Sequence, residues 1–405
     1  MVTCLAGGTV FLDGRLTPGL SVFMENGRIL DVREEDGGTD VTVDVSGCIV
    51  APGFIDLHTH GAGGFDFADG EVSDVLSAAR VHGAHGTTTL CPTAPSLGKA
   101  DTLRCLKNVR RAMEQNGPGR PFLAGSHLEG PCFAPSQKGA QDPRVLRNPD
   151  PRETKKWLKA SAGTLLRVSF APELPGADEL LATLNEAGVL AAYAHTEATY
   201  EELLPFIKKG CRIATHLYSG MNGVTRKGAA RVLGGVETAF LEEEVTAEII
   251  GDGIHLPPPL LLMIYKILGP SRLCLVTDSM RSAGMPEGPS VLGPKKGGVD
   301  CVIRDGVAYM PEGDSYAGSV ATADRLLRTA VQAGIPLSDA LTMLTETPAR
   351  TLGLSDRGTL RPGSVADVCV LSPHLYPQKV FFAGEELRDE YIFNTKGICY
   401  GNPYC

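Results

Sequence analysis

Apolar and polar positions repeat with two different periods along this chain. In residues 1–50, short runs of alternating apolar and polar residues are broken by turns, and the Asn26-Gly27 pair between two such runs is a strong hairpin signal. The same texture returns at residues 366–371 and 379–384. Each terminal segment is too short to bury a core alone. We therefore expect residues 1–50 and 357–405 to pack together as one small β-sandwich domain formed from both termini.

Between these segments, apolar strand patterns alternate with amphipathic helical patterns, for example at residues 72–82, 103–113, 177–187 and 201–209. The candidate strands cover residues 49–57, 87–91, 122–128, 165–170, 189–194, 212–215, 247–250 and 274–277. Eight strands with crossover helices over roughly 230 residues match a closed parallel barrel. We expect an α/β fold, a (β/α)8 TIM-like barrel over residues 51–356. An open doubly wound sheet is the alternative, but no Gly-rich phosphate fingerprint follows the first strand.

The chain does not return to the terminal domain directly after the eighth strand. A Gly- and Pro-rich insertion covers residues 288–314, and we expect it to hold a hairpin. Helical patterns follow at residues 321–332 and 337–345. These two helices are expected to complete the outer ring of the barrel.

Composition excludes several functional classes. The net charge of -9 and the pI of about 5.6 argue against a nucleic-acid or anionic-membrane partner, although a local cation can still hold a small anion. The 11 cysteines lack a C-x-x-C motif, so we expect them to be reduced. The first residues show no basic region followed by an apolar core, and no apolar run is long enough to span a membrane. The cytoplasm is the expected location.

Polar side chains of the metal-binding and acid–base kinds follow the apolar runs at the same end of their strands. They are His58, His60, Glu129, His195, His216 and Asp278. In a parallel barrel these strand ends meet at one mouth, so we expect the six side chains to converge. Because strand side chains alternate faces, the two histidines of the His-x-His pair point the same way and can bind one ion.

Each of these residues also has a purely structural interpretation. The His-x-His pair can lie on a solvated strand face, Glu129 can cap a helix or pair with an arginine, and Asp278 can be a helix N-cap. The other two histidines can be buried core residues with satisfied hydrogen bonds. The histidines without a strand-end context, which we interpret as structural or surface residues, are His82, His85 and His374.

The strand-end residues suggest separate roles, as metal ligands and as a general base and acid. Glu129, His195 and His216 make a three-ligand site with an open position, which is typical of a catalytic metal. His58 and His60 can complete a second metal site, bridged by Glu129 or Asp278. A divalent ion lowers the pKa of water and polarises a carbonyl, which suits amide hydrolysis, and Asp278 is the candidate general base and acid.

The motifs Pro-Gly-Phe-Ile-Asp-Leu-His-Thr-His-Gly, His-Leu-Glu-Gly-Pro, Thr-His-Leu-Tyr, Asp-Gly-Ile-His and Leu-Val-Thr-Asp occur in this order. In them the chain resembles the amidohydrolase superfamily and, within it, the N-acetylglucosamine-6-phosphate deacetylase family. The resemblance implies Glu129, His195 and His216 as metal ligands, Asp278 as the catalytic aspartate, and one or two divalent ions, with Zn²⁺ favoured and Fe²⁺ as the alternative. It also implies an amino-sugar phosphate substrate and a homodimer in which an arginine of the neighbouring subunit helps to hold the sugar phosphate.

The same resemblance suggests substrate contacts, some of them altered in this chain. His255 matches a substrate-contacting histidine. Ser219 and Gly220 replace the Asn-Ala pair that contacts the phosphate, and Gln141 stands where some members have a ligand-contacting histidine. Arg226, the expected phosphate partner, lies where the family's Arg-Glu-Pro-Gly segment is replaced, which makes the acetamide a safer prediction than the 6-phosphate. We also expect the backbone N–H groups of Ser219 and Gly220 to be able to hold an anion.

Two other functions remain open from the sequence. One is hydrolysis of a different amide, such as an unphosphorylated N-acetylhexosamine, an N-acyl-D-amino acid or a cyclic ureide. The other is a non-catalytic scaffold related to these enzymes, which the intact set of ligand positions and Asp278 argues against.

Overall fold

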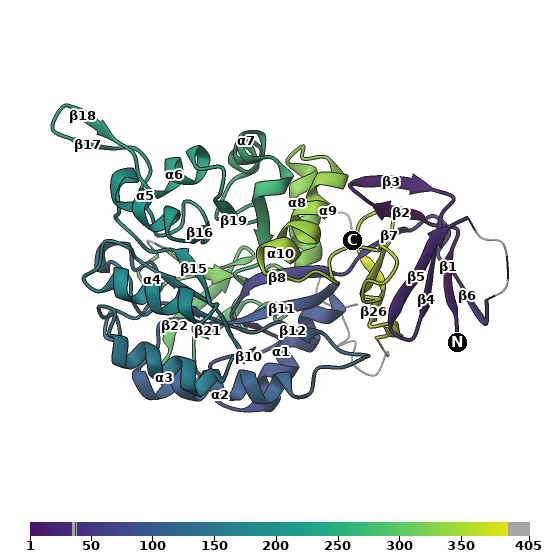
Figure 1. The fold of residues 1–405 in the computed structure, drawn as a ribbon, viewed down its shortest axis with the longest axis horizontal. Helices are drawn as coiled ribbons and strands as arrows, with labels where there is room; N and C mark the ends of the chain where they lie inside the picture. Colours follow the sequence, from purple (N-terminus) through teal and green to yellow (C-terminus); the bar gives the residue numbers. More distant parts are fainter. Residues whose placement is uncertain (35–36, 38, 314, 388–405) are drawn as a thin grey trace.

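The computed structural model describes residues 1–34, 37, 39–313 and 315–387. Figure 1 shows two parts, a strand-and-helix barrel on the left and a smaller unit of strands on the right that contains the N-terminus. Within the described residues, no helix has the length and apolar content needed to cross a bilayer.

The larger part is a barrel of parallel strands. Neighbouring strands pair in the order β8 (Phe54–Thr59), β11 (Thr87–Ala94), β13 (Ser126–Glu129), β14 (Leu165–Phe170), β15 (Leu190–Tyr193), β16 (Cys211–Ala214), β19 (Thr246–Ile250) and β20 (Leu273–Val276), while β12 (Phe122–Leu123) also pairs with β11. The barrel is joined between its last and first strands, where the Asp278 N–H donates to the His58 carbonyl at 2.9 Å and the Thr277 hydroxyl donates to Asp56 at 2.5 Å. The predicted barrel is confirmed.

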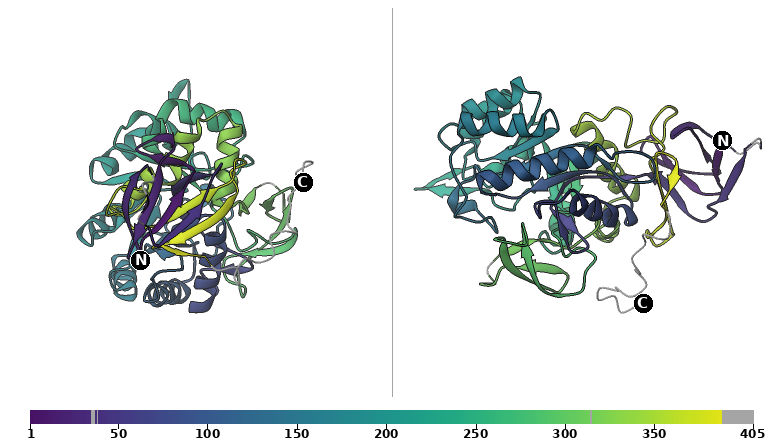
Figure 2. Two further views of the ribbon diagram at one scale, coloured as in Figure 1. Left: turned by 90° about the vertical axis from the view of Figure 1, so that its right-hand side faces the viewer. Right: turned by 90° about the horizontal axis from the view of Figure 1, so that it is seen from below.

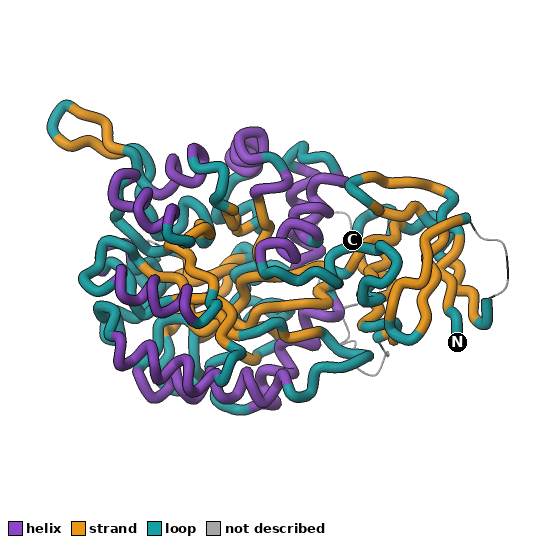
Figure 3. Tube along the Cα trace, in the orientation of Figure 1, coloured by secondary structure: helices purple, strands orange, loops and turns teal. Residues whose placement is uncertain are grey.

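Helices form the outer layer of the barrel, as Figure 3 shows. They are α1 (Val72–Ala84), α2 (Lys99–Met113), α3 (Pro151–Ser161), α4 (Ala177–Glu186), α5 (Tyr200–Lys208), α6 (Gly235–Leu241), α7 (Pro258–Leu268), α8 (Ala323–Gln332), α9 (Leu337–Leu344) and α10 (Glu346–Thr351). Short 3-10 turns are η1 (Pro135–Gln137) and η2 (Pro270–Arg272). Apolar side chains on the inward helix faces, such as Leu106 and Leu181, pack with strand residues such as Val168 in one continuous core. Burial of this face is what orders most of these helices.

The smaller part consists of two sheets facing each other. One has the order β5 (Arg28–Arg33), β4 (Ser21–Glu25), β1 (Thr3–Ala6) and β6 (Val41–Asp44); the other has the order β27 (Glu385–Glu386), β26 (Pro377–Phe382), β25 (Val368–Leu371), β7 (Ile49–Pro52), β2 (Thr9–Leu12) and β3 (Arg15–Pro18). Leu5 and Val22 of the first sheet pack with Val10 and Val370 of the second. The left panel of Figure 2 shows the N-terminal and C-terminal strands together. This confirms the sandwich built from both termini; the exact domain division stays a prediction, and residues 388–405 lie outside the described part.

The apolar run at residues 49–57, expected as one strand, is two strands separated at Gly53. The first, β7, pairs with β2 and β25 in the sandwich, and the second, β8, pairs with β11 in the barrel. A Cβ at Gly53 would lie 2.1 Å from the Thr88 side chain, while the Gly53 N–H donates to the Asp367 carbonyl at 2.8 Å. The glycine therefore lets one apolar run serve two sheets.

The insertion after the eighth strand is larger than the expected hairpin. It forms a four-stranded antiparallel sheet of β21 (Gly288–Leu292), β22 (Val299–Arg304), β23 (Val307–Tyr309) and β24 (Tyr316–Ser319), seen at the lower left of the right panel of Figure 2. Its last strand returns to the barrel mouth, where the Ser319 N–H donates to the Asp278 carbonyl at 2.9 Å. Two-stranded hairpins are formed by β9 (Gly61–Ala62) with β10 (Phe65–Asp66) and by β17 (Thr225–Lys227) with β18 (Ala230–Val232).

His82 of α1 gives the fold a pH dependence that can be measured. Its Nε2 lies 2.9 Å from the Thr59 hydroxyl and 3.1 Å from the Gly61 carbonyl, and burial lowers the pKa of His82 from 6.5 to about 4. As pH falls through this window, the unfolded chain binds a proton that the folded chain excludes, so stability is lost. Between pH 7 and pH 5 the loss from this group is about 2 kcal/mol.

We expect H82Q to lose about 2 kcal/mol less than wild type between pH 7 and pH 5, measured as the free energy of unfolding in urea. The control is H374Q, which removes an exposed histidine. An equal loss of stability in H82Q and wild type would contradict the prediction.

Candidate active site

Three residues of the barrel mouth have an unusual backbone conformation. His195, His216 and Asp278 each come two residues after the end of a barrel strand, and their φ angles are 46°, 31° and 46°. Non-glycine residues seldom adopt this left-handed region, and where they do so the surrounding structure holds them there. These turns place each side chain at the barrel mouth beside the others.

Glu129, the last residue of β13, lies at the centre of the site. Its Oε1 is 2.8 Å from Nε2 of His216 and 3.1 Å from Nε2 of His195. Its Oε2 is 3.3 Å from Nε2 of His60 and 3.7 Å from Nε2 of His58. All five residues are buried. One carboxylate thus lies between two pairs of imidazoles, with one oxygen facing each pair.

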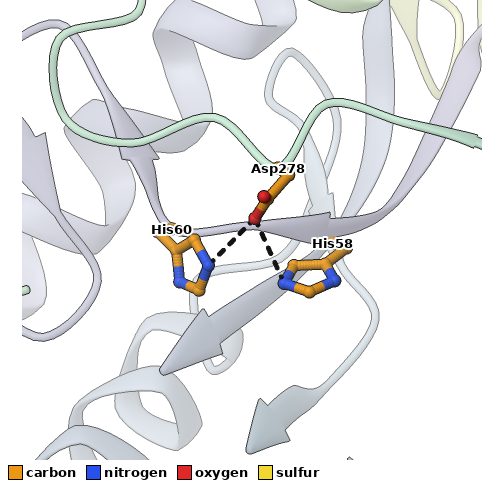
Figure 4. Close-up of side chains that lie close together, drawn as sticks. All are labelled: His58, His60 and Asp278. Carbon is orange, nitrogen blue, oxygen red and sulfur yellow. Dashed lines mark ion pairs between the residues drawn. The ribbon is translucent and has the colours of Figure 1, made fainter. Parts of the chain in front are cut away.

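Asp278 contacts the same Nε2 atoms of the His-x-His pair as Glu129 does. Figure 4 shows its carboxylate between the two rings, with Oδ1 3.1 Å from Nε2 of His60 and 3.4 Å from Nε2 of His58. Its exposed fraction is 8%. The six strand-end side chains predicted to converge therefore do converge.

The carboxylates make this mouth a place that stabilises positive charge. Burial alone would lower the pKa of His58, but the Glu129 and Asp278 carboxylates outweigh burial and raise it to about 9. Burial alone would also lower the pKa of His60, but the same two carboxylates raise it well above its usual value. Conversely, burial would raise the pKa of Asp278, but His58 and His60 lower it below its ordinary value.

The donor set fits a divalent cation. The site contains two groups of three residues whose ligand atoms lie within 4.8 Å of one another inside each group. The groups are His58 with His60 and Asp278, and His58 with Glu129 and His216. Both ring nitrogens of His58 and Nδ1 of His216 are buried and have no hydrogen-bond partner among the described residues, a costly arrangement without a further ligand. Imidazole nitrogens with carboxylate oxygens are the ligands used for catalytic zinc and for non-haem iron. The described residues can therefore hold a metal ion.

Neighbouring groups orient the candidate ligands. Nδ1 of His195 lies 2.7 Å from the Gln137 carbonyl, and Nδ1 of His60 lies 3.2 Å from the Thr93 carbonyl. Gln141, expected as a substrate contact, donates from Nε2 to Glu129 Oε2 at 2.8 Å and accepts from the Ser96 N–H at 2.7 Å. Its amide thus links the central carboxylate to the backbone of Ser96, and its contact with a substrate stays a prediction.

The other expected substrate residues are placed differently. His255 lies with Nδ1 2.8 Å from Asp252 and its ring 4.8 Å from that of Tyr316 on the insertion sheet. The Ser219 N–H already donates to the His216 carbonyl at 2.9 Å, so that amide is not free for an anion in this conformation. Gly220, at φ 64°, passes so close to the site that an added Cβ would lie 2.5 Å from His195 Nδ1.

Arg226 lies apart from the six convergent side chains. It belongs to the hairpin of β17 and β18, which projects from the barrel at the upper left of Figure 1, and it is exposed. Lys227 and Arg231 on the same hairpin are exposed too. Within one chain, the structure does not bring this arginine to the barrel mouth.

Two charged residues near the site were not identified from the sequence. Glu248 of β19 and Arg167 of β14 are fully buried inside the barrel, and Glu248 Oε2 lies 3.6 Å from Nδ1 of His58. The sequence does contain one signal that could have pointed to them, because each is the single charged residue within an otherwise apolar strand segment. Such a residue on a buried strand must have a partner, but the sequence does not say which one.

The chain resembles known amide hydrolases over most of its length. The sequence profile of the Amidohydrolase family matches residues 49–387. The chain is 31% identical to the N-acetylgalactosamine-6-phosphate deacetylase of Escherichia coli O157:H7, over 83% of this chain and 87% of that protein. It is 30% identical to the N-acetylglucosamine-6-phosphate deacetylase of Lysinibacillus sphaericus, over 90% of this chain and 92% of that protein.

Solved structures give the same result. A mutant of N-acetyl-D-glucosamine-6-phosphate deacetylase from Mycobacterium smegmatis, in complex with N-acetyl-D-glucosamine-6-phosphate, is 34% identical, with a TM-score of 0.88 over 95% of this chain and 99% of that chain. The N-acetylglucosamine-6-phosphate deacetylase of Thermotoga maritima is 26% identical, with a TM-score of 0.84 over 95% of this chain and 99% of that chain.

The donor set predicts that stability depends on divalent ions. A ligand that binds only the folded state stabilises it, by about 2.7 kcal/mol at 100 times its Kd. We expect treatment with a chelator to lower the melting temperature and added Zn²⁺ to restore it. In H216A the gain from Zn²⁺ should be smaller, because one ligand of the Glu129 group is missing. The exposed-site control is H374A, and an equal gain in H216A and H374A would count against the site.

Proposed function

Because this chain belongs to the amidohydrolase family, we propose that it hydrolyses the acetamide of an N-acetylated amino-sugar phosphate, N-acetylglucosamine 6-phosphate in the first place. The products are acetate and the free amino sugar. Relatives that are about 30% identical over most of this chain are named as deacetylases of this substrate class. The observation that carries the proposal is the convergence of Glu129, His195 and His216 beside the group formed by Asp278 and the His-x-His pair.

We assign the five candidate ligands Glu129, His195, His216, His58 and His60 to one or two divalent ions, Zn²⁺ first and Fe²⁺ second. Glu129, His195 and His216 would hold one ion, and His58 and His60 would hold the other together with Glu129 or Asp278. Such ions, when bound, supply a Lewis acid for the amide carbonyl and lower the pKa of water to near ~7.

Asp278 is placed to move the proton in this reaction. Its low pKa keeps the carboxylate ionised at neutral pH, so it can accept a proton from the attacking water. As the water oxygen bonds to the carbonyl carbon and the C–N bond breaks, Asp278 returns the proton to the leaving amine nitrogen. The side chain is almost completely buried, which shields the transferred proton from bulk water. His255, held through Nδ1 by Asp252, keeps its Nε2 available for the sugar phosphate.

Replacing Asp278 tests this assignment. We expect D278N to lower kcat by about 10²- to 10⁴-fold, because the amide cannot accept the proton. Acetate release and bound metal should be measured on the same preparation, and D300N, at an exposed position, is the matched control. Near-normal turnover by D278N with its metal retained would remove Asp278 from the role of base.

The substrate class is tested by a panel of sugars. N-acetylglucosamine and N-acetylgalactosamine, each with and without the 6-phosphate, should be compared by acetate release. We expect the phosphorylated sugars to have the higher kcat/KM, because in a dimer the exposed cations on the β17–β18 hairpin of a neighbouring subunit would be available for the phosphate. Equal kcat/KM for both forms would remove the phosphate from the proposal.

We further propose that the protein acts as a homodimer in which Arg226 of each chain serves the site of the other. Two features support this arrangement. The projecting, exposed hairpin carries cations that its own barrel mouth does not use. Apolar side chains are also exposed nearby in the sequence, at Val224 beside the hairpin and at Leu241, Met263 and Ile267 on α6 and α7.

Mixing two inactive variants tests the shared site. In a mixed dimer of D278N and R226A, one of the two sites combines an intact Asp278 with an intact Arg226. After random exchange of subunits, we expect recovery of about one quarter of wild-type activity, because half of the dimers are mixed and each has one complete site. Each variant incubated alone is the control. No recovery despite verified subunit exchange would contradict the arrangement.

A further inference from the structure

A buried ion pair lies inside the barrel beneath the candidate metal site. Arg167 comes from β14 and Glu248 from β19, and both side chains are completely buried. The guanidinium donates to both carboxylate oxygens, with Nη2 at 3.0 Å from Oε2. A buried pair of this kind contributes little net stability, because desolvation offsets the attraction. Stability alone is therefore a weak reason for its presence.

The pair contacts the candidate ligands directly. Glu248 Oε2 lies 3.6 Å from Nδ1 of His58, on the side of the ring away from Glu129 and Asp278. Arg167 also donates to the hydroxyl of Thr215, at 2.7 Å, which is the residue before His216. The carboxylate is thus fixed from one side by Arg167 and turned toward His58 on the other.

A second branch of the same buried layer reaches His60. Polar contacts run from Thr215 to Ser169 at 3.0 Å, from Ser169 to His127 at 2.7 Å, and from His127 to Thr93 at 3.2 Å. The Thr93 carbonyl lies 3.2 Å from Nδ1 of His60. Both histidines of the His-x-His pair therefore have Nδ1 facing an acceptor in the barrel interior and Nε2 facing the site.

The other half of the site is supported differently. Nδ1 of His195 faces the Gln137 carbonyl on a loop above the barrel, and Gln141 on the same loop region holds Glu129. Nδ1 of His216 has no hydrogen-bond partner in the part of the chain that the structure describes. Among the candidate ligand histidines of the described chain, the buried ion pair thus faces only His58 through a ring nitrogen.

We propose that Glu248, fixed by Arg167, is a positioning residue: its carboxylate faces Nδ1 of His58 at 3.6 Å, favours the proton of the neutral imidazole on that nitrogen and leaves Nε2 free toward the site. A neutral imidazole has two tautomers, and a carboxylate at Nδ1 selects the one whose Nε2 lone pair is free to bind a metal ion. The consequence is that an ion at the His58–His60 group depends on Glu248 through a ring nitrogen of one of its own ligands, while neither His195 nor His216 has a ring nitrogen that faces the pair. This inference deepens the two-ion form of the proposed function and rests on it.

The test removes both members of the pair, so that no unpaired charge is left in the barrel. The variant is R167M/E248L, and the matched control is R357M/D367L, which removes a largely buried Arg–Asp pair whose contacts are with Phe122 and Ala383 and not with the candidate ligands. Zn²⁺ binding per chain is titrated in competition with a chelator, and the melting temperature of each metal-free protein is recorded. Loss of such an outer partner weakens metal binding by about 10- to 100-fold.

We expect R167M/E248L to keep one Zn²⁺ with wild-type affinity and to bind the second about 10- to 100-fold more weakly. The control should bind both as wild type does. E248Q keeps an amide oxygen that can accept from Nδ1, so it should recover part of the affinity for the second ion that the double variant loses.

Three results would overturn the inference. The first is two ions bound to R167M/E248L as tightly as to wild type. The second is equal weakening of both ions in proportion to a fall in melting temperature, which a purely structural role would give. The third is a single ion in the wild type. Absence of acetate release by wild type, with two ions bound and the variants behaving as expected, would instead refute the proposed function and leave the positioning role intact.

Discussion

The arrangement of this site depends on one carboxylate between two pairs of imidazoles. Glu129 can face His195 and His216 with one oxygen and the His-x-His pair with the other only if four strands end at the same level of the barrel. A parallel barrel provides this geometry, because all its strands point the same way and their ends form one rim. The fold therefore brings side chains from strand ends that are distant in the sequence into contact with one another.

Burying several charged groups in one site costs desolvation free energy, and contacts within the surrounding structure offset this cost. Buried carboxylates without partners would be protonated, yet the contacts with imidazoles keep Glu129 and Asp278 ionised. Left-handed backbone at three of the site residues adds about 1–3 kcal/mol of strain at each. The barrel tolerates both the buried charge and the backbone strain because the rest of it is a large apolar core, whose burial stabilises the fold.

Much of this could be predicted from the sequence because the relevant signals are local. A histidine directly after an apolar strand run marks a strand end, and the barrel converts strand ends into neighbours. Glu248 and Arg167 could not be paired in this way, since each is one charge in the middle of a strand and its partner is set by barrel register. The break at Gly53 was equally hidden, because the apolar pattern continues through it and only the close approach of Thr88 requires a glycine.

The same hydrogen bonds that close the barrel also complete the site. The seam between β20 and β8 is joined by the Asp278 N–H to the His58 carbonyl and by Thr277 to Asp56. Asp278 and His58 are more than two hundred residues apart in sequence, so their approach requires every intervening strand to be in place. The Asp278 carboxylate and the His-x-His pair therefore meet only when the last strand joins the first. Closure of the barrel is thus a condition for the proposed chemistry as well as for the fold.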